Sequence, residues 1–263
     1  MEDIFVTVLV TLLAGLGAGL GTGFAGMSAA AVISPMLIAF LDVDPYMAVA
    51  IALASDVLAS AVSAYTYARH RNVDVKHGFV MLVFVLAFTV VGSVVAQYVS
   101  QNSMEAIAVV LTFILGLRFI IHPVSAEHSR LKESTLCARV IKEIIAGMMI
   151  GFVCGFVGAG GGMMMLFALT SVLGYELKTA VGTSVFIMTF TALTGSVSHF
   201  ALGGMPDDIL ILLLCMGFTL MFARIAALIA NKASHKALNR MTGCVLVLLG
   251  IAIFFFSDVF KNA

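Results

Sequence analysis

The chain has 263 residues, of which 62% are hydrophobic and 11% charged, and its formal net charge is zero. This small number of charged side chains cannot cover the surface of a soluble domain of this length. The composition therefore predicts a membrane protein. Zero net charge excludes a global field that would attract nucleic acid. The four cysteines are widely spaced and form no CxxC pair, so we expect neither a metal nor another cofactor.

Helices are expected rather than strands, because the apolar stretches are continuous and reach the roughly 20 residues that cross a bilayer. The N-terminus begins with the acidic residues Glu2 and Asp3 instead of a basic region, so we expect the first segment to be retained and not cleaved as a signal peptide. The first half then consists of a glycine-rich segment, a short segment over 28–41 and three longer segments. The longer segments cover 46–69, 78–99 and 104–121.

The second half repeats this order. An offset of 132 residues aligns Ala14–Gly26 with Ala146–Gly158 without a gap, and 14–49 shares ten identical positions with 146–181. Five segments in each unit place the second copy upside down. We therefore predict an all-α membrane protein of about ten segments in two inverted repeats. The repeats cover 1–121 and 142–263, and a cytoplasmic linker joins them over 122–141. After its glycine-rich segment, the second repeat has segments at 163–173, 179–202, 207–230 and 241–257.

The charged residues of the loops predict an orientation. Lys and Arg accumulate in the connections that follow the third segment, join the repeats and precede the last segment, whereas the loops at 42–44 and 207–208 are acidic. In the five-plus-five arrangement these basic connections share one side, which the positive-inside rule makes cytoplasmic. Both termini are then expected to lie outside.

Glycines shape the first segment of each repeat. Gly15, Gly19 and Gly23 share one helical face, which is typical of close helix packing. The run at 158–162 predicts a break instead, because each glycine costs about 1 kcal/mol inside a helix. Since 144–157 and 163–173 are too short for about 30 Å of hydrocarbon, we predict two half-helices joined by a Gly-rich turn in each repeat, around Gly23–Ala30 in the first.

The helices that leave these turns, from Ser28 and from Gly162, would present free backbone N–H groups and positive dipole ends. We expect an anion there, although structural packing alone or a cation bound by carbonyl oxygens would use the same backbone. Thr183 and Ser184 add hydroxyl donors, unless they bond to their own helix. The candidate binding residues are Gly23, Gly26, Ser28, Gly158, Gly160, Gly161, Gly162, Thr183 and Ser184.

Asp56 lies near the middle of segment 46–69, where an unpaired carboxylate costs several kcal/mol. It is either an acid that couples transport to a proton or a sodium ion, or a structural residue. A structural Asp56 would pair with Arg118 or Arg224, or bond to neighbouring hydroxyls. Its counterpart in the second repeat is Met188, so its role is not duplicated. We expect no enzymatic activity, because the sequence has no HExxH, GxSxG or Walker motif.

Three motifs together make the chain resemble the TauE/SafE family, also called TSUP, over nearly its whole length. The resemblance implies an inner-membrane permease for sulfite, sulfonates or other small organic anions that is driven by an ion gradient. The first half departs from the family pattern at 28–30 and 50–52, and by the presence of Asp56. The motifs are Gly147-x3-Gly151-x3-Gly155-x2-Gly158-x-Gly160-Gly161-Gly162, Ala180-Val181-Gly182-Thr183-Ser184, and Tyr67-Ala68-Arg69 followed by Asn72-Val73-Asp74.

The sequence therefore predicts a secondary transporter that holds a small anion between its two glycine turns and exposes it alternately to each side. An anion channel could use the same helix ends, and a membrane subunit that only scaffolds partners is the other alternative. The expected partners are the substrate anion, a coupling proton or sodium ion and the lipid bilayer. The chain could also form a homodimer.

Overall fold

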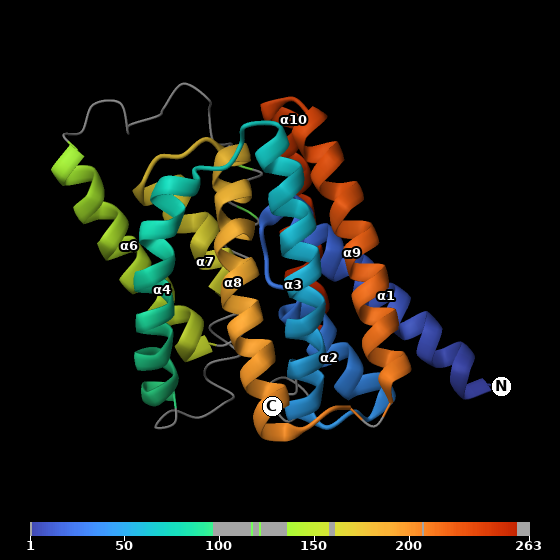
Figure 1. Cartoon of the computed structure of the whole chain (residues 1–263). Coiled ribbons are helices and arrows are strands. Elements are labelled where there is room, and N and C mark those ends of the chain that lie inside the picture. The colour runs from blue at the N-terminus through green and yellow to red at the C-terminus, as the bar shows by residue number, and fades with distance from the viewer. Residues whose placement is uncertain are drawn as a thin grey trace.

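The computed structural model describes residues 2–96, 117, 121, 136–157, 161–206 and 208–256, and all regular structure within these ranges is helical (Figure 1). Five of the helices, namely α1, α3, α4, α8 and α9, contain stretches long and apolar enough to cross a membrane. In chain order the helices are α1 (Glu2–Ala25), α2 (Ala30–Leu41), α3 (Pro45–Arg69), α4 (Val75–Ala96), α6 (Leu136–Val157), α7 (Gly161–Phe167), the π-helical turn η2 (Ala168–Val172), α8 (Leu177–Gly203), α9 (Ile209–Lys232) and α10 (His235–Phe256).

The first helix of each predicted pair is longer than a half-helix. α1 has 24 residues and α6 has 22, which gives about 36 and 33 Å at roughly 1.5 Å per residue. The prediction of a short segment over 144–157 is therefore wrong, because α6 begins at Leu136. Arg139 and Lys142 are good helix formers and let the helix continue beyond the apolar run. The last six residues of the predicted linker 122–141 are consequently helical.

The second helix of each pair is short, as predicted. α2 has 12 residues, and α7 and η2 together cover residues 161–172. The predicted segment over 104–121 lies outside the described residues except at Leu117 and Ile121.

The break between α1 and α2 occurs where the glycines predict it. Gly26 has a φ of +60°, a left-handed conformation that glycine adopts without steric cost. Its amide still donates to the Thr22 carbonyl oxygen at 3.0 Å, and the Met27 amide donates to Gly21 at 3.2 Å. The chain then reverses, so α2 runs back along the direction from which α1 came (Figure 1).

Glycines allow backbones to touch at two helix pairs. A Cβ atom added at Gly15 of α1 would lie 2.5 Å from the Phe218 Cβ of α9, and one at Gly19 would lie 2.7 Å from the Phe222 Cβ. In the other pair, a Cβ atom at Gly147 of α6 would lie 3.1 Å from the Phe84 Cβ of α4, and one at Gly151 would lie 3.0 Å from that of Phe88. Close helix packing therefore explains these glycines.

The two contacts correspond to each other. Gly15 and Gly19 are related to Gly147 and Gly151 by 132 residues, and the phenylalanines that they face are related by 134. Between the pairs, α3 and α8 run antiparallel: Gly203 of α8 meets Tyr46 near the start of α3, and Gly182 meets Tyr67 near its end. The same glycine–aromatic contact is therefore built twice, on either side of the α3–α8 pair.

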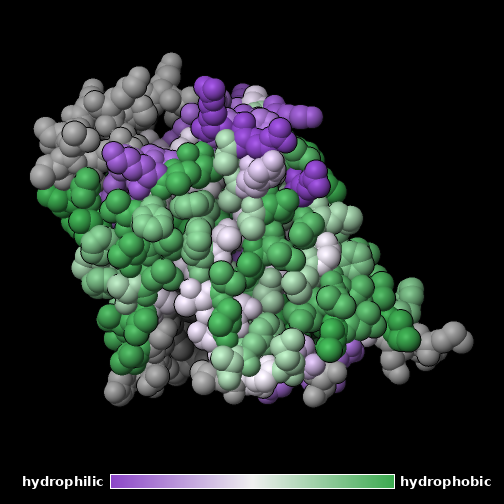
Figure 2. All heavy atoms as spheres, viewed as in Figure 1, coloured by the Kyte–Doolittle hydropathy of each residue, from purple (hydrophilic) through white to green (hydrophobic). Residues whose placement is uncertain are grey.

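Polar and apolar surfaces are separated. Figure 2 shows a largely apolar body with hydrophilic residues gathered at its upper edge, where α3 and α9 end and α4, α8 and α10 begin. We call this edge the basic end, because it carries Arg69, Arg71, Lys76, Lys142, Lys178, Lys232, Lys236 and Arg240. Large apolar side chains such as Phe5 and Val90 are 70% and 65% exposed on the body. The fold is that of a membrane protein.

Substitution of Gly151 by alanine tests the backbone contact. The new Cβ would clash with the Val85 carbonyl oxygen, so α4 and α6 must separate, at a cost of about 1–3 kcal/mol. The matched control is Gly217→Ala, because a Cβ there meets nothing within 4 Å. We expect Gly151→Ala alone to lower the thermal unfolding midpoint in detergent. Equal midpoints for the two variants would contradict this packing.

Candidate functional site

Asp56 lies on the buried face of α3 and is 1% exposed. Ser28 Oγ donates a hydrogen bond to its Oδ2 at 2.7 Å, and Ser60 Oγ donates to Oδ1 at 2.9 Å. The backbone amide of Ala29 also donates to this carboxylate. The side chain of Asp56 therefore occupies the N-terminus of α2, the position at which the sequence predicted an external anion.

Of the structural alternatives for Asp56, bonding to neighbouring hydroxyls is the one observed. Arg224 is exposed on α9, and among the described residues it forms no ion pair with Asp56. Arg118 lies outside the described residues. These bonds do not exclude a coupling role, because a protonated carboxyl group could keep the same two neighbours by reversing one hydrogen bond.

The glycine turn after α1 lies against the first turn of α7. A Cβ atom added at Gly162 would lie 2.6 Å from the Gly26 carbonyl oxygen and 2.8 Å from the Ser28 nitrogen. On the other side of Gly26, Ser184 Oγ donates to the same carbonyl at 2.9 Å. These contacts therefore form one cluster between the two halves of the chain. We call it the turn cluster, and its residues are Gly26, Ser28, Asp56, Gly162 and Ser184.

The other predicted site residues lie elsewhere. Gly23 packs against α9, where an added Cβ would clash with that of Ala226. Thr183 Oγ1 accepts a hydrogen bond from the Asp74 amide at 3.0 Å and so stabilises the start of α4. Gly161 is the first residue of α7, and Gly158 and Gly160 lie outside the described residues.

Hydroxyl groups satisfy the carbonyl oxygens at the end of α1. These oxygens lie inside the protein, at the end of α1 and in the turn that follows it, where an unpaired carbonyl is costly. Three of the donors come from other helices, one from each of α3, α8 and α10. The bonds are Tyr67 Oη to Gly23 O, Thr242 Oγ1 to Phe24 O and Thr22 Oγ1 to Met27 O, each 2.9 Å long, in addition to Ser184 Oγ to Gly26 O.

Sequence reasoning gave Ser60 and Tyr67 no defined role at the site. Ser60 follows Asp56 by one helical turn, and this spacing is the signal that predicts a hydrogen bond between the two side chains. Tyr67 is fully buried and follows Asp56 by three turns, so it lies on the same face of α3. Ser63, between them, is also fully buried, and its Oγ has no hydrogen-bond partner among the described residues. Together they form a polar stripe on α3.

The turn cluster can hold an anion only by hydrogen bonds and helix dipoles, because it contains no lysine or arginine within the part of the chain that is described. The carboxylate of Asp56 already takes the donors at the start of α2. An external anion must therefore compete with this carboxylate, or bind only after protonation has removed the charge of Asp56. Ser28 is half-buried and the rest of the cluster is buried, so access requires helices to separate.

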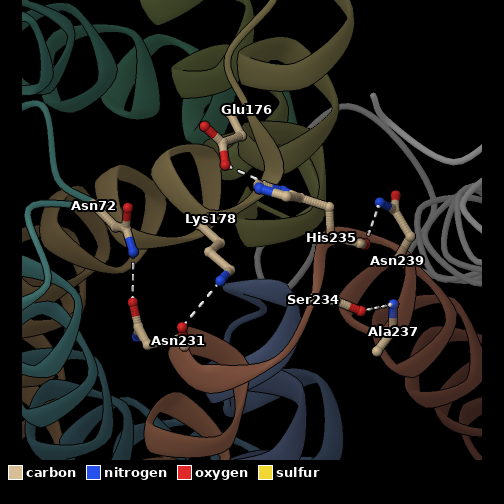
Figure 3. Close-up of polar contacts among 8 residues, drawn as sticks. All are labelled: Asn72, Glu176, Lys178, Asn231, Ser234, His235, Ala237 and Asn239. Atoms are coloured by element: carbon tan, nitrogen blue, oxygen red, sulfur yellow. Dashed lines mark hydrogen bonds and ion pairs between the residues drawn. The ribbon is translucent and has the colours of Figure 1, made fainter. Parts of the chain in front are cut away.

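At the basic end, polar contacts hold four helix ends together (Figure 3). Asn72, after α3, donates through Nδ2 to Asn231 Oδ1 on α9 at 2.7 Å. Lys178 at the start of α8 donates to the Asn231 carbonyl oxygen at 2.9 Å. His235 at the start of α10 lies 3.1 Å from the Glu176 carboxylate. Together these contacts join the ends of α3, α8, α9 and α10.

Comparison with known proteins agrees with this architecture. The model of the sulfite exporter TauE/SafE family matches residues 11–253. The chain belongs to the TauE/SafE family. It is 25% identical to the probable membrane transporter protein YunE of Bacillus subtilis, over 88% of this chain and 91% of that protein. It is 20% identical to the probable membrane transporter protein YdhB of the same organism, over 88% and 94% of the two chains. No solved structure matches the chain.

A probable membrane transporter protein of Haemophilus influenzae is 26% identical over 56% of each chain. Membership of this family indicates transport rather than catalysis. Within the described residues, no group of three or more His, Cys, Asp or Glu side chains is placed to hold a metal ion.

Gly26→Ala tests the contact between the first glycine turn and α8. It adds backbone strain at φ +60° and places a Cβ 2.5 Å from Ser184 Oγ. The control is Gly204→Ala at φ +78° and ψ −173°, where an added Cβ has no neighbour within 4 Å, so it measures backbone strain alone, of about 1–3 kcal/mol. We expect the larger loss of thermal stability at Gly26.

Ser184→Gly should recover part of that loss in the double variant, because it removes the crowded side chain. A double-mutant cycle on thermal unfolding measures this recovery. Strictly additive effects of the two substitutions would contradict the contact between Gly26 and Ser184.

Proposed function

We propose that the protein is a secondary transporter that moves a small anion, such as sulfite, a sulfonate or another small organic anion, together with a proton. Family membership and the names of the relatives, which are probable membrane transporter proteins, support transport across a membrane. The charge of the basic end supports an inner-membrane orientation with that end in the cytoplasm and both termini outside.

We further propose two inverted repeats over 1–121 and 142–263. The duplicated contact of α1 with α9 and of α6 with α4 supports this arrangement, as does the antiparallel α3–α8 pair between them. Inverted repeats give a transporter two conformations of similar energy, each open to one side. In this proposed cycle, the contacts of Asn72 and Lys178 with Asn231 belong to the conformation that is closed at the basic end.

The single observation that carries the proposal is the position of the Asp56 carboxylate at the start of α2, where Ser28 donates to it. When Asp56 is ionised, its charge fills this site and repels a second anion. When Asp56 binds a proton, the charge disappears while the helix dipole remains, so an external anion can bind. The proton and the anion therefore bind in the same state of the transporter.

Ser28 can transmit this change. Its hydroxyl group now donates to Asp56, and its oxygen accepts from the Ala30 amide at 3.3 Å. A protonated Asp56 donates to Ser28 Oγ instead, which frees the Ser28 hydrogen to point toward the substrate. Protonation thus removes a competing anion and supplies a donor. A proton fits this scheme better than sodium, because hydrogen-bond donors surround the carboxylate.

Methanesulfonate uptake into proteoliposomes tests the coupling. This substrate is suitable because a sulfonate stays ionised at every pH of interest and cannot carry the proton itself. We expect external acidification to drive accumulation. Asp56→Asn imitates the protonated acid, so it should keep anion exchange between the two sides but lose accumulation driven by the pH gradient. Asp42→Asn, at an exposed loop position, is the control that should keep both.

Several outcomes would contradict the proposal. Accumulation by Asp56→Asn equal to the wild type would make Asp56 structural, and accumulation driven only by a sodium gradient would replace the proton. Flux that neither saturates nor shows counterflow would indicate an anion channel. A folded protein that moves no sulfite, sulfonate or carboxylate under any ion gradient would indicate a scaffold subunit.

A further inference from the structure

A surface groove lies between α3 and α9 near the basic end, and its lining shares no residue with the turn cluster. It has a volume of about 490 Å³, and its lining includes Tyr65, Thr66, Arg69 and His70 of α3 and Arg224 and Leu228 of α9. The groove therefore joins a helix of the first half of the chain to a helix of the second.

The groove concentrates positive charge without a carboxylate. Its lining includes two guanidinium groups and one imidazole but no Asp or Glu. Neither Arg69 nor Arg224 forms an ion pair among the described residues. His70 Nδ1 lies 2.8 Å from the Thr66 carbonyl oxygen, which can only accept, so Nδ1 carries the hydrogen and Nε2 is left for a ligand.

Both arginines lie toward the ends of their helices at the basic end. Arg69 is the last residue of α3, whereas Arg224 precedes the end of α9 by eight residues, or about 12 Å at roughly 1.5 Å per residue. Both guanidinium groups line the groove, and the planar fork of a guanidinium group suits a phosphate, whose oxygens accept its paired N–H donors.

The remaining walls suit the rest of a lipid. Tyr65 is 63% exposed and Leu228 is 38% exposed, and the Arg69 guanidinium carbon lies 5.8 Å from the centre of the Tyr65 ring. Tyrosine is typical of the boundary between headgroups and hydrocarbon. A soluble anion would gain nothing from these apolar walls, whereas a phospholipid can place its glycerol and upper acyl chains against them.

We propose that this groove binds an anionic phospholipid, with the phosphate held by Arg69, Arg224 and His70 and the acyl chains lying along α3 and α9. Bound in this way, one lipid links a helix of the first half to a helix of the second. The proposal concerns a second site and does not depend on the anion transported at the turn cluster.

Native mass spectrometry of delipidated protein tests the site, with phosphatidylglycerol, phosphatidylcholine and inorganic phosphate as separate probes. We expect the wild type to retain phosphatidylglycerol at least tenfold better than phosphatidylcholine. The double variant Arg69→Gln/Arg224→Gln should lose most of this preference. The matched control Lys236→Gln/Arg240→Gln removes the same charge from the basic end of α10 and should keep it.

A single Arg224→Lys variant keeps the charge but loses the planar guanidinium group, so its preference for phosphatidylglycerol should lie between those of the wild type and the double variant. This variant also tests the site if the double variant does not fold. Equal phosphatidylglycerol preference in the wild type and in the groove variants would overturn the proposal. Displacement of the lipid by millimolar inorganic phosphate would identify a soluble-anion site instead. Efficient disulfide crosslinking of Tyr65→Cys between two copies in the bilayer would show that a second protein chain covers the groove.

Discussion

The fold depends on one constraint, the need to satisfy an interrupted backbone in the interior of a membrane protein. Where α1 stops at Ala25, its last carbonyl oxygens can find no water in hydrocarbon. Hydroxyl groups from α3, α8 and α10 supply the missing donors, and the Asp56 carboxylate supplies the acceptor at the start of α2. The break is therefore stable only when helices from both halves of the chain surround it.

The same constraint explains why glycines dominate the sequence around the break. The start of α7 can lie against the backbone of the first turn only if no Cβ intervenes, and Gly162 provides this gap beside Gly26 and Ser28. The glycines earlier in α1 and α6 serve another purpose, because they bring these helices close to α9 and α4. Sequence spacing distinguished the two classes: a repeat of four residues marks a helix face, and consecutive glycines mark a break.

How much could be predicted varied with the range of the interaction. The break and the short α2 followed from glycine positions and segment lengths. The partners of Asp56 were open, although Ser60 lies one turn away. Thr242 gave no signal, because it reaches Phe24 across 218 residues and a lone helical threonine more often bonds to its own helix. Thr183 shows the same limit, since only the fold brings it to the start of α4.

The asymmetry between the halves limits how the proposed mechanism can work. Where the first half has Asp56, the second has Met188, whose sulfur lies 2.8 Å from the position of a Cβ at Gly162. A thioether neither binds a proton nor repels an anion, so only one of the two turns can respond to pH. In the proposed cycle a single acid then binds one proton with each anion, and for a singly charged substrate the loaded transporter carries no net added charge across the membrane.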